Sequence, residues 1–204
     1  MSLASLRDKL FRKRRLYKYL LTDSPKLYLG CGDTHQDGYI NVDIRPTPAA
    51  DLVADINWCL KHLASKCSEV YLSHILEHLS QPGQSMRDTP GTVLHFMRQA
   101  NNLLAPGGIL RVAVPDFEAL ARLYVEENHP LHPRLLDRIC GGQTYPENLH
   151  KCVFDRAFLT TCFHATGFTG IRTWNPRDLG LARDASFDEI NNTPTSLNLC
   201  ATKA

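Results

Sequence analysis

Two glycines and an acid form the pattern in this sequence that is best suited to bind a ligand. Gly30 and Gly32 follow a short, mostly apolar run at residues 26–29, and Asp43 ends a second strand-like run at residues 40–43. A strand that ends in Gly-x-Gly can bring its backbone close to a ligand, because no Cβ is in the way. A carboxylate at the end of the next strand can accept hydrogen bonds from both hydroxyls of a ribose. The pattern predicts a nucleoside site, and an ordinary β-turn between two core strands is the alternative.

The spacing of these residues separates two kinds of nucleoside cofactor. A nicotinamide site has a third glycine three residues after the second, and its acid follows the first glycine by roughly 20 residues. Here His35 stands in place of the third glycine, and Asp43 follows Gly30 by 13 residues. The third glycine opens the helix that holds a pyrophosphate. The spacing therefore favours a nucleoside without a pyrophosphate, of which S-adenosylmethionine (SAM) is the common example, over a nicotinamide cofactor.

A second group of residues that could do chemistry lies after a later strand. His74, Glu77 and His78 stand at i, i+3 and i+4, which places them on one face if this segment is helical. His150 lies in a loop rich in glycine and proline. His150 is the first candidate for a general base and His74 is the second, while a structural histidine is the alternative for His150. The same four residues could instead bind a divalent metal ion.

Length and composition indicate the class of protein. The chain has 204 residues, of which 43% are hydrophobic and 22% are charged, as is typical of one globular domain. No apolar run approaches the roughly 20 residues of a membrane span, and no secretion signal is recognised at the start. The seven cysteines contain no Cys-x-x-Cys pair. We therefore expect reduced thiols in a cytoplasmic protein.

The beginning of the chain differs in charge from the remainder. Residues 1–20 contain seven Lys or Arg and one Asp, although the net charge of the whole chain is only +2. The body of the protein is therefore net acidic, and we expect no binding of nucleic acid. Residues 1–25 are expected to form an amphipathic basic helix that packs on the body, and peripheral contact with anionic lipid or a polyanionic substrate is the alternative. Residues 26–204 form the main domain, whose oligomeric state the sequence leaves open.

The elements that must position these residues alternate between strands and helices, which predicts an α/β fold with a mainly parallel sheet. Only residues 33–39 separate the first two strands, so their connection must be a turn or loop and not a helix. Residues 128–154 are expected to be irregular. Strands are expected over residues 26–29, 40–43, 52–54, 68–72, 109–114, 168–174 and 196–202, and helices over residues 58–64, 89–104, 117–126 and 155–166.

Taken in this order, the motifs resemble those of the class I SAM-dependent methyltransferases. More closely, they are similar to a bacterial subgroup of small predicted methyltransferases that is associated with polysaccharide biosynthesis. The resemblance covers residues 26 to about 203. It is carried by residues 27–32, 38–43, 74–79, 104–108, 114–116, 141–143, 165–168 and 196–198, together with His150 and Phe154.

This resemblance implies a Rossmann-like, three-layer α/β/α fold with a sheet of seven mainly parallel strands, the last antiparallel. SAM would lie across the carboxyl ends of the first strands. Families that hold a metal near this point have an acid at the position of His74, so we expect no metal. Carried over by position, Gly30 and Gly32 line the methionine part, Asp43 binds the ribose, Asp55 and Ile56 bind the adenine, and Ser73 and His74 face the sulfonium side. Ile44 is also expected to bind the cofactor. For Asp55, the N-cap of the following helix is an equal alternative.

The activity that follows is methyl transfer from SAM to a small-molecule or glycan-linked acceptor, with a sugar hydroxyl as one candidate. Holding the two reactants in line contributes about 7–11 kcal/mol. A general base contributes typically 10²–10⁴-fold, so it matters mainly for a poor nucleophile such as a hydroxyl. The alternative is a non-catalytic module that keeps the fold and the ligand. The intact set of Gly30, Gly32 and Asp43 favours the enzyme.

Overall fold

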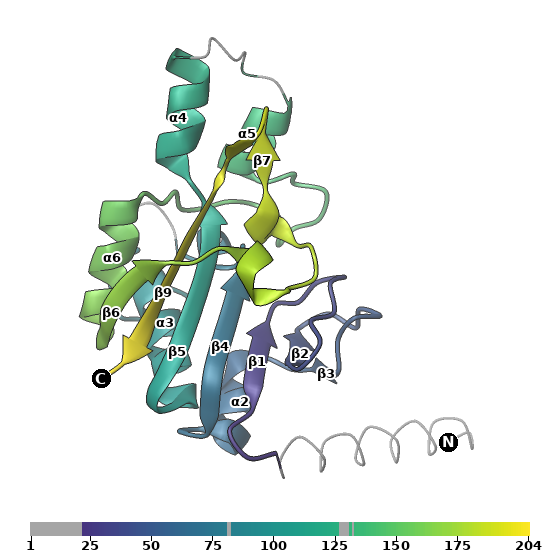
Figure 1. The fold of residues 1–204 in the computed structure, drawn as a ribbon, viewed down its shortest axis with the longest axis vertical. Helices are drawn as coiled ribbons and strands as arrows, with labels where there is room; N and C mark the ends of the chain where they lie inside the picture. Colours follow the sequence, from purple (N-terminus) through teal and green to yellow (C-terminus); the bar gives the residue numbers. More distant parts are fainter. Residues whose placement is uncertain (1–21, 81–82, 127–130, 132) are drawn as a thin grey trace.

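A seven-stranded sheet forms the centre of the protein (Figure 1). The computed structural model describes residues 22–80, 83–126, 131 and 133–204, so most of the expected helix over residues 1–25 lies outside the described residues. The strand order is β3-β2-β1-β4-β5-β9-β6, and only β9 runs antiparallel to its neighbours. The predicted sheet is therefore confirmed. Its strands are β1 (Lys26–Leu29), β2 (Ile40–Asp43), β3 (Leu52–Val53), β4 (Cys67–Ser73), β5 (Leu104–Pro115), β6 (Phe168–Thr173) and β9 (Ser196–Lys203).

The central strands are apolar because both of their faces are covered. On one face, Leu27, Val70 and Leu110 lie side by side in register and are fully buried. Three helices cover this face and share one core with it: α2 (Ile56–Leu63), α3 (Val93–Leu103) and α6 (Arg156–Ala165). The apolar side of α3 faces this core. The helix begins later than expected, because Thr92 accepts a hydrogen bond from His95 N as its N-cap.

The opposite face of the sheet is aromatic and is covered differently. Tyr28 and Tyr71 stack with ring centroids 4.7 Å apart, and Trp174 meets Tyr71 edge-on. Asp184 accepts hydrogen bonds from both tyrosine hydroxyls, at 3.0 and 2.7 Å. Within the described residues, this layer consists of loops with two 3₁₀ helices in place of α-helices. These helices are η2 (Pro176–Leu179) and η3 (Ala185–Phe187).

The connection between β1 and β2 is a loop, as its length required. Gly30 N and Cys31 N both donate to Val42 O, at 2.7 and 3.1 Å. Gln36 N donates to Asn41 Oδ1 at 2.8 Å, so the loop folds back on the start of β2. The two strand ends, with Gly30 and Asp43, are thereby held side by side.

Two sequence-based expectations are wrong. Residues 74–79 do not form an α-helix, because His74 takes a positive φ of 52° and only η1 (Leu76–His78), a short 3₁₀ helix, follows. Residues 128–154 are not wholly irregular, since they contain α5 (Pro133–Cys140). Pro133 fits the first turn of that helix and Gly141, with φ +78°, fits its end. The residues that suggested a loop are therefore the boundaries of a helix.

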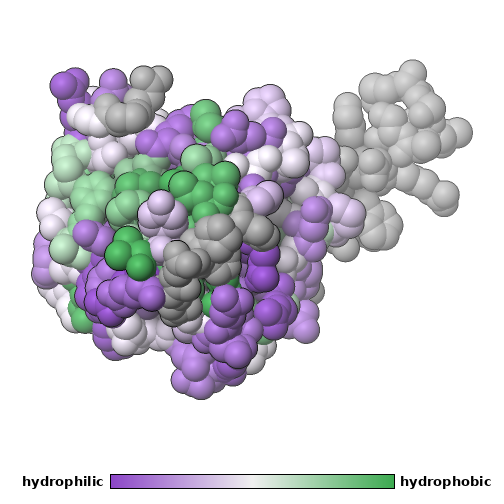
Figure 2. All heavy atoms as spheres, turned by 90° about the horizontal axis from the view of Figure 1, so that it is seen from above, coloured by the Kyte–Doolittle hydropathy of each residue, from purple (hydrophilic) through white to green (hydrophobic). Residues whose placement is uncertain are grey.

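The end of the molecule at which the parallel strands finish also carries α4 (Phe117–Val125) and a small hairpin, β7 (Glu189–Ile190) and β8 (Thr193–Pro194). Figure 2 looks onto this end and shows apolar side chains gathered among hydrophilic ones. None of the described helices is long and apolar enough to cross a membrane. Ligand sites of parallel α/β sheets lie at this end. Large apolar residues exposed in and near α4 and α5 are Phe117, Val125, Leu131, Leu136 and Val153.

Candidate active site

A cavity of about 430 Å³ lies at the carboxyl ends of β1, β2 and β4. Of the eight residues expected to bind the cofactor, seven line this cavity: Gly30, Gly32, Asp43, Ile44, Asp55, Ile56 and His74. The eighth, Ser73, is buried and does not line it. The structure therefore brings together residues that come from four separate stretches of the sequence.

Asp43 is held firmly at the wall of this cavity. Its Oδ2 accepts a hydrogen bond from Gly32 N at 2.8 Å, and its Oδ1 accepts one from Arg45 N at 2.7 Å. The Arg45 guanidinium lies 3.5 Å from the same oxygen. Although Asp43 is only 5% exposed, each carboxylate oxygen keeps a second lone pair. The carboxylate can therefore accept further hydrogen bonds from a ligand without moving.

The turn at Gly30 requires a glycine for two reasons. Its φ is +69°, a region that other residues rarely adopt. A Cβ at this position would also displace Ile75 Cδ1, the end of a flexible side chain that lines the cavity. Gly30 thus allows the end of β1 to lie directly against Ile75 in the cavity wall.

Asp55 and Ile44 take different positions on the wall. Asp55 Oδ1 accepts a hydrogen bond from Trp58 N at 2.8 Å, so the expected N-cap of α2 is present. Asp55 also lines the cavity, so its contact with adenine stays a prediction. Ile44 is 63% exposed, which is unusual for an aliphatic residue and leaves its side chain available to a ligand.

Four polar residues of the wall were not singled out from the sequence. Tyr145, Glu147 and Lys151 come from the loop after α5, and Arg45 lies two residues after Asp43. The Arg45 guanidinium lies 4.7 Å from the centre of the Tyr145 ring. The only sequence signal for them is the position of the loop, since loops at strand ends of such sheets carry ligand sites.

His74 connects this cavity with a second one. Its Nδ1 lies 3.2 Å from Glu77 Oε1, and its Nε2 lies 3.1 Å from Ser196 Oγ. Ser196 Oγ donates to Asn198 Oδ1 at 3.1 Å, while Asn198 Nδ2 donates to Ser186 O at 2.9 Å. The single hydroxyl proton of Ser196 is thus directed at Asn198. The network therefore assigns a proton to His74 Nε2, which donates to Ser196.

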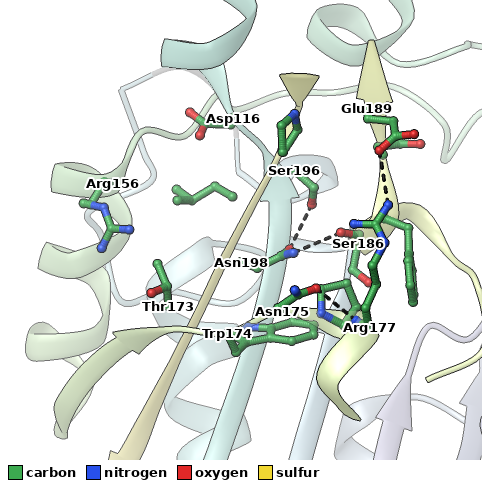
Figure 3. Close-up of a pocket in the computed structure, with 15 residues that line it drawn as sticks. Asp116, Arg156, Thr173, Trp174, Asn175, Arg177, Ser186, Glu189, Ser196 and Asn198 are labelled. Atoms are coloured by element: carbon green, nitrogen blue, oxygen red, sulfur yellow. Dashed lines mark hydrogen bonds and ion pairs between the residues drawn. The ribbon is translucent and has the colours of Figure 1, made fainter. Parts of the chain in front are cut away.

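The second cavity has a volume of about 300 Å³ and lies where β5 and β6 end and β9 begins (Figure 3). Figure 3 shows the chain of hydrogen bonds through Ser196 and Asn198 on one side, and the pair of Arg177 and Glu189 on the other, at 3.2 Å. Its wall contains both hydrogen-bond donors and hydrogen-bond acceptors, set among apolar and aromatic side chains. The polar and aromatic residues of this wall include Asp116, Arg156, Thr173, Trp174, Asn175, Arg177, Ser186, Asp188, Glu189, Ser196 and Asn198.

Asp116 lies on the wall of the second cavity and is the N-cap of α4. Its Oδ1 accepts hydrogen bonds from Glu118 N and Ala119 N, at 3.1 and 3.4 Å. Burial raises the pKa of Asp116, although these backbone hydrogen bonds act in the opposite direction.

His150 lies beside Glu77 and does not line either cavity. Its side chain is 8% exposed, its Nε2 is 4.0 Å from Glu77 Oε1, and its ring is 4.8 Å from that of His78. Burial lowers the pKa of His150, even though Glu77 acts to raise it. Burial alone would raise the pKa of Glu77, but His74, His78 and His150 outweigh it and hold that pKa below its ordinary value. Of the two candidate bases, only His74 reaches the cavity wall, and both roles remain predictions.

Comparison with known proteins identifies the fold. No protein-family model matches the sequence, and no curated protein matches it. A SAM-dependent methyltransferase from Archaeoglobus fulgidus is similar in structure, with a TM-score of 0.52 and 16% identity over 96% of this chain and 94% of that chain. The trans-methyltransferase CalH, in complex with S-adenosylhomocysteine (SAH), has a TM-score of 0.54 and 13% identity over 95% of this chain and 55% of that chain. The CurJ carbon methyltransferase has a TM-score of 0.51 and 15% identity over 89% of this chain and 49% of that chain.

These similarities show the fold alone, because all three identities are low. The chain has the fold of the SAM-dependent methyltransferases, with a seven-stranded sheet whose last strand is antiparallel. It spans about half of the CurJ and CalH chains and nearly all of the archaeal one.

Proposed function

We propose that this protein is a SAM-dependent methyltransferase that acts on a small-molecule or glycan-linked acceptor. The observation that carries the proposal is Asp43, a buried carboxylate fixed by Gly32 N at the wall of a 430 Å³ cavity. This volume lies within the range of about 300–1,000 Å³ for ligand sites. The fold and the SAH bound by one structural neighbour agree with this assignment.

In the proposed complex, SAM lies along the residues expected from the sequence. Gly30 and Gly32 leave room for the methionine part, and Asp43 accepts hydrogen bonds from the ribose hydroxyls. The exposed side chain of Ile44 lies against the nucleoside, and Asp55 and Ile56 adjoin the adenine. His74 borders the sulfonium side and stands between SAM and the second cavity.

The reaction is a direct displacement at the methyl carbon. A lone pair of the acceptor forms the new bond to carbon while the C–S bond breaks, and its electron pair stays on sulfur to give SAH. The charge of the sulfonium disappears, and an acceptor hydroxyl releases its proton to a base or to water. Alignment of the two reactants, worth about 7–11 kcal/mol, is the main contribution expected of the protein.

The second cavity is the proposed acceptor site, and its wall favours an acceptor with several hydroxyl groups. A hydroxyl both donates and accepts hydrogen bonds. The wall offers carboxylates such as Glu189, a guanidinium from Arg177 and the amide of Asn198, together with the aromatic ring of Trp174. Such a mixture suits a sugar better than a purely apolar acceptor. The contact between His74 and Ser196 places this cavity next to the SAM site.

Calorimetric titration with SAM, and separately with NADH, tests the cofactor assignment. We expect micromolar SAM binding and no response to NADH. Asp43→Asn should weaken SAM binding by roughly 10–100-fold, because charge-assisted hydrogen bonds to the ribose are lost. Asp37→Asn changes a fully exposed acid of the preceding loop and should have no effect.

A second pair of variants keeps the test independent of folding. Ile44→Ala removes an exposed side chain from the cavity wall and should weaken SAM binding roughly 10-fold without loss of stability. Val53→Ala removes a similar exposed side chain outside the cavity and is the control. Absence of SAM binding by well-folded wild-type protein would overturn the proposal.

The acceptor is then sought by SAH release from SAM in the presence of simple glycosides, nucleotide sugars, phenols and amines. Turnover with a sugar, reduced by Arg177→Gln and not by Arg122→Gln, would support the acceptor site. Arg122 is a suitable control because it forms an exposed pair with Glu118 on α4, outside the second cavity. Turnover only with apolar acceptors would contradict the proposed acceptor site.

A further inference from the structure

Glu77 is a fully buried carboxylate that lacks a hydrogen-bond donor. It is 0% exposed, and neither carboxylate oxygen accepts a well-aligned hydrogen bond from the described residues. Its nearest basic neighbour is the His74 imidazole, with Nδ1 3.2 Å from Oε1. A buried charge is costly unless it is paired and hydrogen-bonded or coordinates a metal. Such a group therefore calls for a positively charged ligand or partner.

Two histidines beside Glu77 present unprotonated nitrogens. His78 Nδ1 lies 3.2 Å from Leu149 O, and His150 Nδ1 lies 3.1 Å from Arg138 O. A carbonyl oxygen can only accept, so Nδ1 carries the proton of each neutral ring and Nε2 keeps its lone pair. Metal-binding histidines are oriented in the same way, by a hydrogen bond from the nitrogen that does not bind the ion.

Glu77, His78 and His150 are close enough to share one ion. Each offers a donor atom, and the three atoms all lie within 4.8 Å of one another. Bonds of about 2.0–2.2 Å to a metal place neighbouring ligand atoms about 3–3.5 Å apart. Closure of the site therefore requires movements of only about 1 Å, which small side-chain rotations supply.

The backbone holds the segments of this cluster together. Lys151 N and Cys152 N both donate to Glu77 O, at 2.7 and 3.2 Å, so the chain after His150 is fixed to η1. The His150 ring lies against Gly141, where an added Cβ would approach His150 Cδ2 to 3.0 Å. The backbone thus holds the two imidazoles and the carboxylate close together.

We propose that Glu77, His78 and His150 bind a divalent metal ion beside the SAM cavity. Two nitrogens and one carboxylate suit ions such as Mn²⁺, Co²⁺ and Zn²⁺ better than Mg²⁺ or Ca²⁺, which prefer oxygen ligands. Three protein ligands leave positions open for water or an acceptor oxygen. The sequence favoured no metal because His74 replaces an acid, but His74 is not needed here, since its Nε2 is bonded to Ser196.

The position of the cluster suggests what the ion does. His78 lines the SAM cavity, so an ion bound to it lies next to that cavity. A metal-bound hydroxyl loses its proton more readily than a free one. An acceptor hydroxyl held by the ion would then be a better nucleophile toward the methyl group. This role rests on the proposed function, whereas binding of the ion does not.

The test is direct metal loading of the full chain. Protein stripped with EDTA is titrated with Mn²⁺, Co²⁺ and Zn²⁺ by calorimetry, and the metal that remains after gel filtration is counted by elemental analysis. We expect one equivalent per chain for at least one of these ions. Glu77→Gln and His78→Gln should each weaken binding of that ion at least 10-fold. Because His78 is only partly buried, its substitution should leave the fold intact even if Glu77→Gln does not fold.

His62→Asn is the matched control. His62 Nδ1 also lies near a backbone carbonyl, Trp58 O at 2.9 Å, but among the described residues no carboxylate lies within ion-pair distance of it. Its substitution should leave metal binding unchanged. Folded wild-type protein that binds none of the three ions, or binds them equally well after His78→Gln, would overturn the proposal. The cluster would then be a buried pair of Glu77 and His74.

A parallel SAM titration of the stripped protein separates this inference from the proposed function. SAM binding without metal binding would leave the methyltransferase proposal standing and remove the metal site. Metal binding without SAM binding would leave the metal site standing and overturn the methyltransferase proposal.

Discussion

His74 Nε2 donates to Ser196 Oγ across 3.1 Å, and this contact joins the walls of the two cavities. His74 follows β4 and Ser196 begins β9, which lie on either side of β5 in the sheet. The positive φ of His74 turns its backbone at the strand end. A residue of the proposed SAM cavity is thereby hydrogen-bonded to a residue of the proposed acceptor cavity.

Ser196→Ala tests how much this contact stabilises the protein. The substitution removes the partner of His74 Nε2 and the donor to Asn198 Oδ1. We expect the free energy of unfolding to fall by about 1–3 kcal/mol, measured by urea denaturation, because polar groups are left unpaired. SAM affinity should stay close to that of wild type, since Ser196 does not line the SAM cavity.

Ser68→Ala provides the comparison for that experiment. Ser68 Oγ makes one exposed hydrogen bond, to Ser24 O at 2.8 Å, so its loss should change the free energy of unfolding by less than about 0.5 kcal/mol. Equal effects of the two substitutions would show that the network through Ser196 contributes no special stability.

Gly30→Ala and Gly38→Ala separate backbone strain from a steric clash. Both glycines have positive φ, +69° and +80°, so both substitutions carry a similar strain of about 1 kcal/mol. Only Gly30 has a neighbour in the way, Ile75 Cδ1, whereas a Cβ at Gly38 meets nothing within 4 Å. Gly30→Ala should therefore destabilise the protein more in urea denaturation and weaken SAM binding at least 10-fold. Similar SAM affinities of the two variants would contradict this view of the turn.

The meeting of Gly30, Gly32 and Asp43 at one cavity was predictable because their pattern is local. Gly30 and Asp43 end two strands that are neighbours in both sequence and space, and parallel strands finish at the same edge of a sheet. Asp55 likewise directly precedes the helix that it caps. For such residues, the position in the sequence already decides the position in the fold.

The second cavity could not be predicted because it depends on strand order. Asp116 follows β5, Trp174 follows β6 and Ser196 begins β9, and these strands are neighbours only in the folded sheet. The same holds for Glu77 and His150, which a loop brings together across more than 70 residues. The spacing of His74 and Glu77 predicted that the two side chains meet on one face of an α-helix. They do meet, but a turn and a 3₁₀ helix bring them together.

Thiol reactivity tests the burial of the core. All seven cysteines are free, and burial raises the pKa of Cys59, Cys67 and Cys162 to about 12. Reaction with an aromatic disulfide reagent requires a thiolate that the reagent can reach. At a pH of about 8, Cys140 is therefore expected to react rapidly, because its side chain is exposed. The other thiols should react slowly until urea unfolds the protein. Cys140→Ser should remove the fast phase, and a fast phase that survives this substitution would show that the core is open.

Asp116 gives a prediction for the dependence of stability on pH. Burial raises its pKa in the folded state above the unfolded value of about 3.9, so folding favours the protonated acid. Its contribution is therefore destabilising at neutral pH and disappears as the pH falls below the unfolded pKa.

Asp116→Asn keeps an N-cap without the charge, so this variant should be at least as stable as wild type at pH 7. As the pH falls, the free energy of unfolding of wild type should rise relative to that of Asp116→Asn. Asp116→Ala also loses the cap of α4 and should be about 1 kcal/mol less stable than Asp116→Asn throughout. Urea denaturation of the three proteins at several pH values measures these differences, and a wild type that loses stability relative to Asp116→Asn on acidification would contradict the raised pKa.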